Sequence, residues 1–145
     1  MTHDVIDKYE RGPGVKNRDV ARLPTLKKYR LIVSISTLEH VGWDESPRDP
    51  KKLFRALARL KALLATGGEM IVTVPLGYNP ALDEYLRRGR LGFTNVRYLK
   101  RVSASNRWCE VDAAAVRNVR FGAPYMCANG LAIGIFAKKR GSKRD

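Results

Sequence analysis

The chain has 145 residues, a length that predicts one domain with a real hydrophobic core. Hydrophobic residues make up 44% of it, which excludes a disordered chain. The 28 Lys and Arg residues exceed the 14 Asp and Glu residues, and the resulting net charge of +14 indicates either phosphate-rich partners or simply a solvated basic surface.

Three strands are expected in the first third of the chain. Residues 3–10 form a strand-like run that ends in acids, and Gly12-Pro13-Gly14 separates it from a second run over residues 15–20. Residues 29–38 are a near-continuous apolar run, rich in Ile and Val. Such a run predicts a strand buried on both faces, as in a parallel sheet with helices on each side.

A helix is expected to follow, with Asp49 as its N-cap and Pro50 at its first position. Its sheet-facing side carries Leu53, Leu57, Leu60 and Leu64. Its opposite side carries Lys51, Arg55 and Arg59. Gly67 and Gly68 are expected to end this helix, and residues 69–74 to form a buried strand that stops at Pro75. Asn79-Pro80 predicts the start of a second helix, roughly to Arg88.

The pattern changes after Phe93. Residues 96–102 and 108–111, separated by a polar turn, predict a β-hairpin, and Asp112 is expected to cap a short helix through Val119. A final strand is expected over residues 131–137. This order indicates a single α/β domain over residues 1–138 with a partly parallel sheet, followed by a basic tail, residues 139–145, that is expected to be disordered.

The middle of the chain carries the most specific motif. Over residues 31–75, the series strand, Glu39-His40, helix, Gly67-Gly68, strand resembles the second half of a class I S-adenosylmethionine-dependent methyltransferase. The resemblance extends over residues 4–138 and implies a Rossmann-like sheet. One departure is Tyr29-Arg30, where the family commonly has an aromatic residue followed by Asp.

A larger departure concerns the first strand of the family and its Gly-x-Gly-x-Gly loop, neither of which this sequence contains. The resemblance therefore implies a domain truncated at its N-terminus. Because that strand normally lies between the second and fourth strands of the family, two unpaired strand edges and a cofactor crevice without one wall are expected.

The resemblance also implies a cofactor site at the carboxyl ends of the parallel strands. Acids at the first two strand ends would accept hydrogen bonds from the ribose and the adenine: Asp7, Glu10 and Asp19. The stretch facing the methyl donor would be Ser36, Thr37 and Leu38. The alternative is that the acids lie in surface turns. No metal site is expected, because the two histidines and two cysteines are dispersed.

His40 is the candidate catalytic residue, because methyl transfer often needs a base and histidine titrates near neutral pH. Glu39, Tyr78, Asn79 and Trp108 are candidates for an acceptor pocket. Each has a structural alternative: Glu39 and His40 could pin their loop, Asn79 could be a helix N-cap, and Trp108 could be a packing residue.

Together, these features predict a methyltransferase-like protein, and they do not identify its methyl acceptor. Three explanations remain open: a fragment of an enzyme through a wrong gene start or a split gene, a sheet completed by a second copy or a separate polypeptide, or an inactive basic module that binds nucleic acid or a protein. No apolar run reaches about 18 residues and no signal peptide pattern is present, so a cytoplasmic protein without membrane contact is expected.

Overall fold

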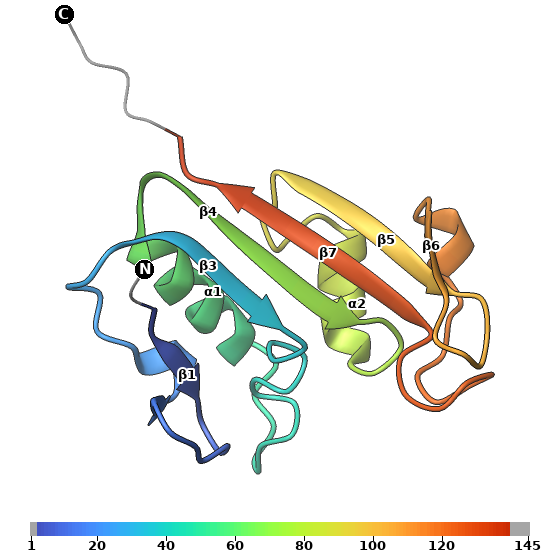
Figure 1. Cartoon of the computed structure of the whole chain (residues 1–145), viewed down its shortest axis with the longest axis horizontal. Helices are drawn as coiled ribbons and strands as arrows, with labels where there is room; N and C mark the ends of the chain where they lie inside the picture. The colour runs from blue at the N-terminus through green and yellow to red at the C-terminus, as the bar shows by residue number, and fades with distance from the viewer. Residues whose placement is uncertain (1–2, 140–145) are drawn as a thin grey trace, which may run out of the picture.

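The computed structural model describes residues 3–139 (Figure 1). The elements in chain order are β1 (Val5–Asp7), β2 (Val15–Asn17), η1 (Val20–Arg22), β3 (Tyr29–Ile35), α1 (Lys52–Leu63), β4 (Leu64–Pro75), α2 (Pro80–Arg87), β5 (Asn95–Arg101), β6 (Trp108–Val111), η2 (Ala114–Val116) and β7 (Gly130–Ala137). No helix among these residues is long and apolar enough to cross a membrane.

The main sheet has five strands in the order β3-β4-β7-β5-β6. β3 and β4 are parallel and are joined by α1, so the predicted strand–helix–strand unit is confirmed. The other three neighbouring pairs are antiparallel, including consecutive strands β5 and β6. In the register of the first three strands, Val33 lies opposite Ile71, which lies opposite Ile135.

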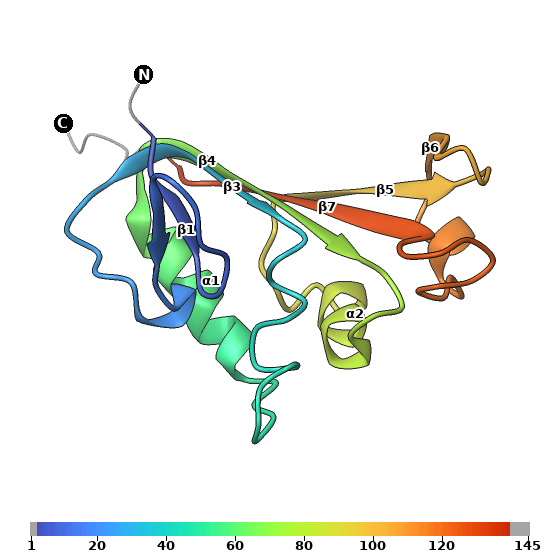
Figure 2. The same ribbon diagram turned by 60° about the horizontal axis from the view of Figure 1, so that its bottom comes forward.

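One face of this sheet is covered by α1 and α2, as the edge-on view of Figure 2 shows. Leucines of α1 pack there against alternate residues of β4, namely Met70, Val72 and Val74, all of which are buried. Burying one such side chain stabilises the fold by about 1.5–3 kcal/mol, so this layer is the main source of stability.

The other face of β3 is open, and the prediction that this strand is buried on both sides is wrong. Leu31, Val33 and Ile35 are 55%, 53% and 68% exposed. The intervening Ile32 and Ser34 are more protected, as expected for a strand with one covered face. The physical reason is that no helix of the described residues packs on this side of the sheet.

The first two strands form a separate small parallel sheet. β1 pairs only with β2, and β3 pairs only with β4, so β1 and β3 each have an unpaired edge. Side chains connect them at both ends: the Tyr29 hydroxyl donates to Asp4 at 2.6 Å, and Lys8 donates to Glu45, in the loop after β3, at 3.0 Å.

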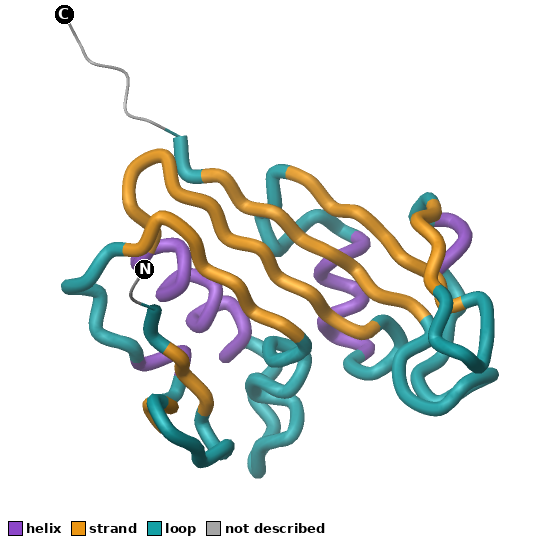
Figure 3. Tube along the Cα trace, in the orientation of Figure 1, coloured by secondary structure: helices purple, strands orange, loops and turns teal. Residues whose placement is uncertain are grey.

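Several boundaries differ from those predicted. α1 begins at Lys52 rather than at Pro50, because the Asp49 carboxylate accepts a hydrogen bond from the Lys51 N–H in the preceding turn and also pairs with Arg55. It ends at Leu63, and β4 follows directly, as the change from helix to strand in Figure 3 shows. Gly67 and Gly68 therefore lie within β4. The following helix matches its prediction, with Asn79 as N-cap.

The predicted helix after Asp112 is only the short turn η2, although the Asp112 side chain does accept from the Ala115 N–H at 2.9 Å. The predicted disordered tail lies, apart from Lys139, outside the described residues.

Candidate functional site

A groove of about 630 Å³ separates β1 from β3. Ile6 and Asp7 form one wall, the consecutive residues 31–35 of β3 form the other, and Leu60 and Leu63 of α1 contribute to its lining. Small-molecule sites typically have volumes of about 300–1,000 Å³, so the groove is large enough for a cofactor-sized ligand.

Asp7 lies where β1 ends and lines this groove. Its Oδ1 accepts hydrogen bonds from the N–H groups of Glu10 and Tyr9, both at 2.7 Å. These bonds hold the pKa of Asp7 below its ordinary value, so that the carboxylate stays ionised. The Glu10 side chain is exposed and is not part of the groove lining.

Asp19 also lines the groove, but other groups of the protein already bind its carboxylate. Oδ1 caps η1 by accepting from the Ala21 N–H at 2.9 Å, and Oδ2 lies 2.7 Å from the Lys52 ammonium. Burial would raise the pKa of Asp19, but the hydrogen bonds from Lys52 and Ala21 outweigh it and lower that pKa. A ligand at Asp19 would therefore have to share the carboxylate with Lys52.

The chain turns sharply where β3 ends. Ser36 has a φ of 45°, in the left-handed region that non-glycine residues rarely adopt, and its N–H donates to the Thr73 carbonyl at 2.9 Å. This turn places Ser36 and Thr37 on the groove. Leu38 is only 2% exposed and belongs mainly to the core.

Beyond this turn, His40, Asp44 and Tyr78 form a polar cluster. The Asp44 Oδ2 atom lies 2.5 Å from His40 Nδ1 and accepts from the Tyr78 hydroxyl at 2.7 Å. The aromatic ring of Tyr78 meets that of His40 edge-on at 5.1 Å and that of Phe121 at the same distance. The hydrogen bond to Asp44 raises the pKa of Tyr78 to about 12, so the phenol remains a donor.

Sequence reasoning did not identify Asp44. The only feature of the sequence that points to Asp44 as a site residue is its position four residues after His40. This spacing brings side chains together within a helical turn. The segment here is a hydrogen-bonded turn, in which the N–H of Asp44 donates to the His40 carbonyl at 3.1 Å.

Glu39 lies beneath the cluster and is 1% exposed. Its Oε1 is 3.6 Å from His40 Nε2, and its Oε2 has no hydrogen-bond partner within the described residues. Burial raises the pKa of Glu39 to about 7. Near neutral pH this carboxyl group is therefore partly protonated, and its protonated form is a hydrogen-bond donor.

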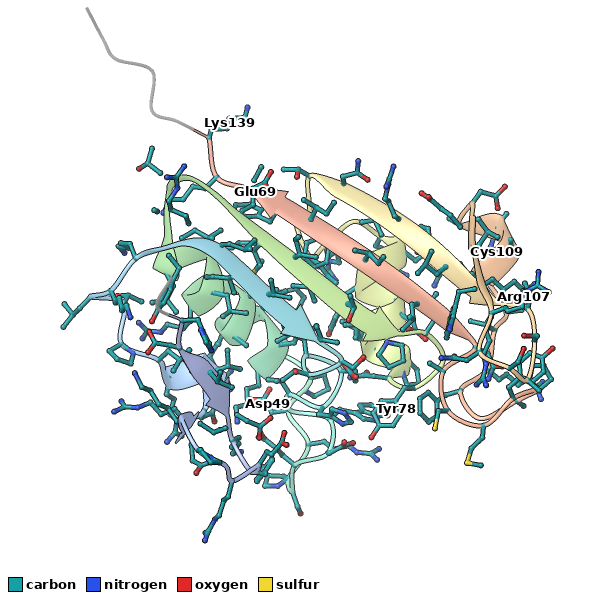
Figure 4. All side chains as sticks on the ribbon, in the orientation of Figure 1. Asp49, Glu69, Tyr78, Arg107, Cys109 and Lys139 are labelled. Carbon is teal, nitrogen blue, oxygen red and sulfur yellow. The ribbon has the colours of Figure 1, made fainter. Side chains whose placement is uncertain are left out.

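The remaining two candidates are Asn79 and Trp108, and neither belongs to the polar cluster of His40, Asp44 and Tyr78. Asn79 is buried as the N-cap of α2, with Oδ1 accepting from the Leu82 N–H at 3.1 Å. Trp108 is on β6, at the opposite edge of the sheet from β3, and donates to Asn106 at 2.8 Å. Figure 4 shows its neighbours Arg107 and Cys109 at the right-hand edge of the molecule, apart from Tyr78. Trp108 therefore does not join the cluster around His40.

Comparison with known proteins shows that the fold is similar to that of solved structures. No family model matches the sequence, and no curated protein matches it. Among solved structures, the N-methyltransferase NodS from Bradyrhizobium japonicum WM9 aligns with a TM-score of 0.52 and 14% identity, over 87% of this chain and 60% of that chain. The NodS complex with S-adenosyl-L-homocysteine aligns with a TM-score of 0.50 and 14% identity, over 86% and 54% of the two chains.

The chain thus spans about 60% of the length of the NodS structure. At 14% identity the likeness concerns the fold alone. The chain has a mixed α/β, Rossmann-like fold similar to that of S-adenosylmethionine-dependent methyltransferases.

Proposed function

We propose that this chain is a methyltransferase-like protein, whose groove takes the adenosine part of S-adenosylmethionine and whose His40 cluster faces the methyl acceptor. The observation that carries the proposal is that one groove is lined both by the acid at the end of β1 and by the residues that follow β3, including His40 and Asp44. In open α/β sheets, ligands bind at these carboxyl ends of the strands.

The residues fit one part of this cofactor better than the other. Asp7 is ionised, and only its Oδ1 is engaged by the described backbone, which leaves Oδ2 free for a ribose hydroxyl. Asp19 would share its carboxylate with Lys52 while accepting from the adenine. The chain offers no glycine-rich loop whose amides could hold the amino-acid part, so we expect weak binding, roughly millimolar at best.

When bound, the cofactor supplies an electrophilic methyl group. The protein's own contribution is to handle the proton of the acceptor. Asp44 accepts from His40 Nδ1–H and thereby leaves the lone pair on Nε2, the arrangement that a base needs. Tyr78 keeps Asp44 in place, and Glu39, close to Nε2, can share the proton.

The unpaired edges of β1 and β3 suggest that the active form needs another polypeptide segment, from a second copy or a separate polypeptide. We also propose a cytoplasmic location, because Cys109 and Cys127 are both free and exposed, as is common in a reducing compartment.

Calorimetric titration with S-adenosylhomocysteine tests the cofactor site directly. The chain should bind with a dissociation constant of about 1 mM, and Asp7→Asn should weaken binding at least about tenfold. The matched control is Asp112→Asn, at an exposed residue that precedes η2. Absence of any binding, or equal affinity of Asp7→Asn and the control, would contradict the proposal.

A second candidate function rests on the charge of +14. A basic module without catalysis would bind nucleic acid through phosphate contacts, and its affinity would fall steeply with salt. Salt-sensitive binding of a single-stranded oligonucleotide, combined with no affinity for S-adenosylhomocysteine, would favour this function over methyl transfer.

A further inference from the structure

The part of the sheet beyond β4 is rich in positive charge. Residues 94–139, which form β5, β6, η2, β7 and the loops between them, contain eight Lys or Arg residues but only two acids, Glu110 and Asp112. Residues 3–49, on the side of the groove, are almost balanced, with nine Lys or Arg residues against eight acids. The charge is therefore unevenly distributed, and a local positive field of this kind attracts polyanions.

Most of these basic side chains have no acidic partner, unlike those at the end of α2. There, Arg87 and Arg88 both pair with Glu84. Within residues 94–139, Arg97 pairs with Glu110 at 3.3 Å. No carboxylate of the described residues pairs with the five other bases of β5 and of the loops around β6 and η2: Lys100, Arg101, Arg107, Arg117 and Arg120. Their charge is thus available to a ligand.

Two loops bring several of these bases to one edge of the sheet. β4 and β5 are both antiparallel to β7, so both end at the edge where β6 and β7 begin. The turn between β5 and β6 and the loop before β7 meet there, at the lower right of Figure 1. Arg101 joins them. Its guanidinium donates to the carbonyls of Ser103 and Ala104 in the turn, at 3.1 and 2.9 Å. It also donates to the Met126 carbonyl in the loop at 2.8 Å and lies over the ring of Tyr125.

Aromatic side chains lie among the bases of this edge. Trp108 is opposite Arg101 in the register of β5 and β6, and the exposed Arg107 precedes it. In the loop before β7, the exposed Arg120 precedes Phe121, which is 39% exposed. Arginines next to aromatic rings are the combination that holds a nucleic-acid strand, because the cations contact phosphates and the rings stack on bases.

The same edge leads to the cluster around His40. Phe121 meets the ring of Tyr78 edge-on at 5.1 Å. Arg120 lies beside the loop after β4, because a Cβ at Gly77 would be 3.0 Å from its Cα. A strand that contacts this loop would therefore lie next to the place proposed above for the methyl acceptor.

We propose that this edge binds a single-stranded nucleic acid. Arg107 and Arg120 contact its phosphates, and Trp108 and Phe121 stack on its bases. A single strand fits better than a duplex, because the bases of a duplex are stacked on one another and offer no free face to a ring. The proposal rests on the second candidate function above, whose binding site it locates, and it does not require cofactor binding. The cofactor test depends on Asp7, so each proposal can fail without the other.

Fluorescence anisotropy with a labelled oligothymidylate of about 15 nucleotides tests the phosphate contacts. We expect a dissociation constant of about 1–100 µM at about 150 mM salt. Arg107→Gln combined with Arg120→Gln should weaken binding at least about tenfold and reduce the slope of log K against log salt by about 1.4, which is about 0.7 for each contact. Asp7→Asn should leave this binding unchanged.

The matched control is Arg22→Gln combined with Arg59→Gln, which removes the same charge at two exposed residues of η1 and α1. It should change the affinity less than about threefold. Equal losses for the two pairs would overturn the proposal, because the strand would then follow the overall charge or another basic segment, such as residues 138–144. Absence of binding to the wild-type chain would overturn it as well.

Tryptophan fluorescence tests the stacking and needs no substitution at the edge itself. Trp43→Phe leaves Trp108 as the only tryptophan of the chain. The oligothymidylate should quench Trp108 fluorescence, whereas a duplex of the same length and poly-L-glutamate should not. An unquenched Trp108 would contradict the proposal. Equal affinity for poly-L-glutamate would also contradict it, since the partner would then be an acidic polypeptide.

Discussion

The side chain of Asn79 joins the loop after β3 to the start of α2. Its amide donates to the Glu39 carbonyl at 2.9 Å while its Oδ1 caps the helix through the Leu82 N–H. Asn79 is buried, so neither bond is exchanged easily for a bond to water. This one residue therefore fixes the position of Glu39 and His40 relative to the loop after β4, which carries Tyr78.

Asn79→Ala should lower the free energy of unfolding by about 2–4 kcal/mol, from the lost N-cap and the unpaired buried carbonyl. Asn79→Ser keeps a capping oxygen but cannot reach Glu39, so about half of that loss is expected. Urea unfolding measures both, with Asn95→Ala, at an exposed position at the start of β5, as the control. If Asn79→Ser is as stable as wild type, the bond to Glu39 does not contribute, and if it is as damaging as Asn79→Ala, the helix cap does not contribute.

Glu39→Gln should change how stability depends on pH. Burial raises the pKa of Glu39 from 4.5 to about 7 in the fold, so the folded chain keeps a proton that the unfolded chain releases. Stability supplied by the neutral carboxyl is therefore complete below pH 4.5 and is lost as the pH rises toward 7. The loss is at most about 3 kcal/mol.

The measurement is urea unfolding from pH 4.5 to 8. Relative to wild type, Glu39→Gln should gain stability through this window, while Glu69→Gln, at an exposed carboxyl on β4, should follow the wild-type curve. Curves of Glu39→Gln and wild type that stay parallel would show that the buried carboxyl does not titrate as stated.

Asp44→Asn should lower the pKa of Tyr78 from about 12 toward its ordinary value of 10.0, because the hydrogen bond to the carboxylate is the main cause of the shift. The ultraviolet absorbance of tyrosinate during an alkaline titration reports this change, and subtraction of the Tyr78→Phe titration isolates the one residue. Asp112→Asn is the control and should leave the titration unchanged. An unaltered Tyr78 titration in Asp44→Asn would argue against the hydrogen bond.

Gly77→Ala should destabilise the chain more than Gly89→Ala, although both glycines have left-handed backbone conformations, with φ of 80° and 64°. A Cβ at Gly77 would lie 2.7 Å from the Val119 carbonyl oxygen and 2.8 Å from the Phe121 nitrogen, whereas none lies within 4 Å at Gly89. We expect a cost of about 1 kcal/mol at Gly89, from backbone strain alone, and about 3 kcal/mol or more at Gly77.

Thermal unfolding of both variants tests this difference. Equal losses would mean that the segment around Phe121 shifts freely. In that case the packing of Phe121 on Tyr78 does not restrain the cluster around His40.

Local signals were enough to predict most of the elements that build the site. The apolar run before Ser36 and the leucine spacing of α1 predict the parallel pair β3–β4, because hydrophobic periodicity and the handedness of crossovers are properties of the chain itself. Asn79-Pro80 predicts the start of α2 for the same reason, since capping acts within one turn.

Contacts between distant segments determined the rest. The apolar run of β3 does not reveal which of its faces is covered, because exposure of Val33 depends on whether another layer packs there. Lys52 takes the Asp19 carboxylate only because α1 packs against η1, and Trp108 is remote from His40 only because β6 lies at the far edge of the sheet. The sequence determined which side chains could carry the chemistry, while tertiary packing decided which of them meet, since their separation in space depends on the whole sheet.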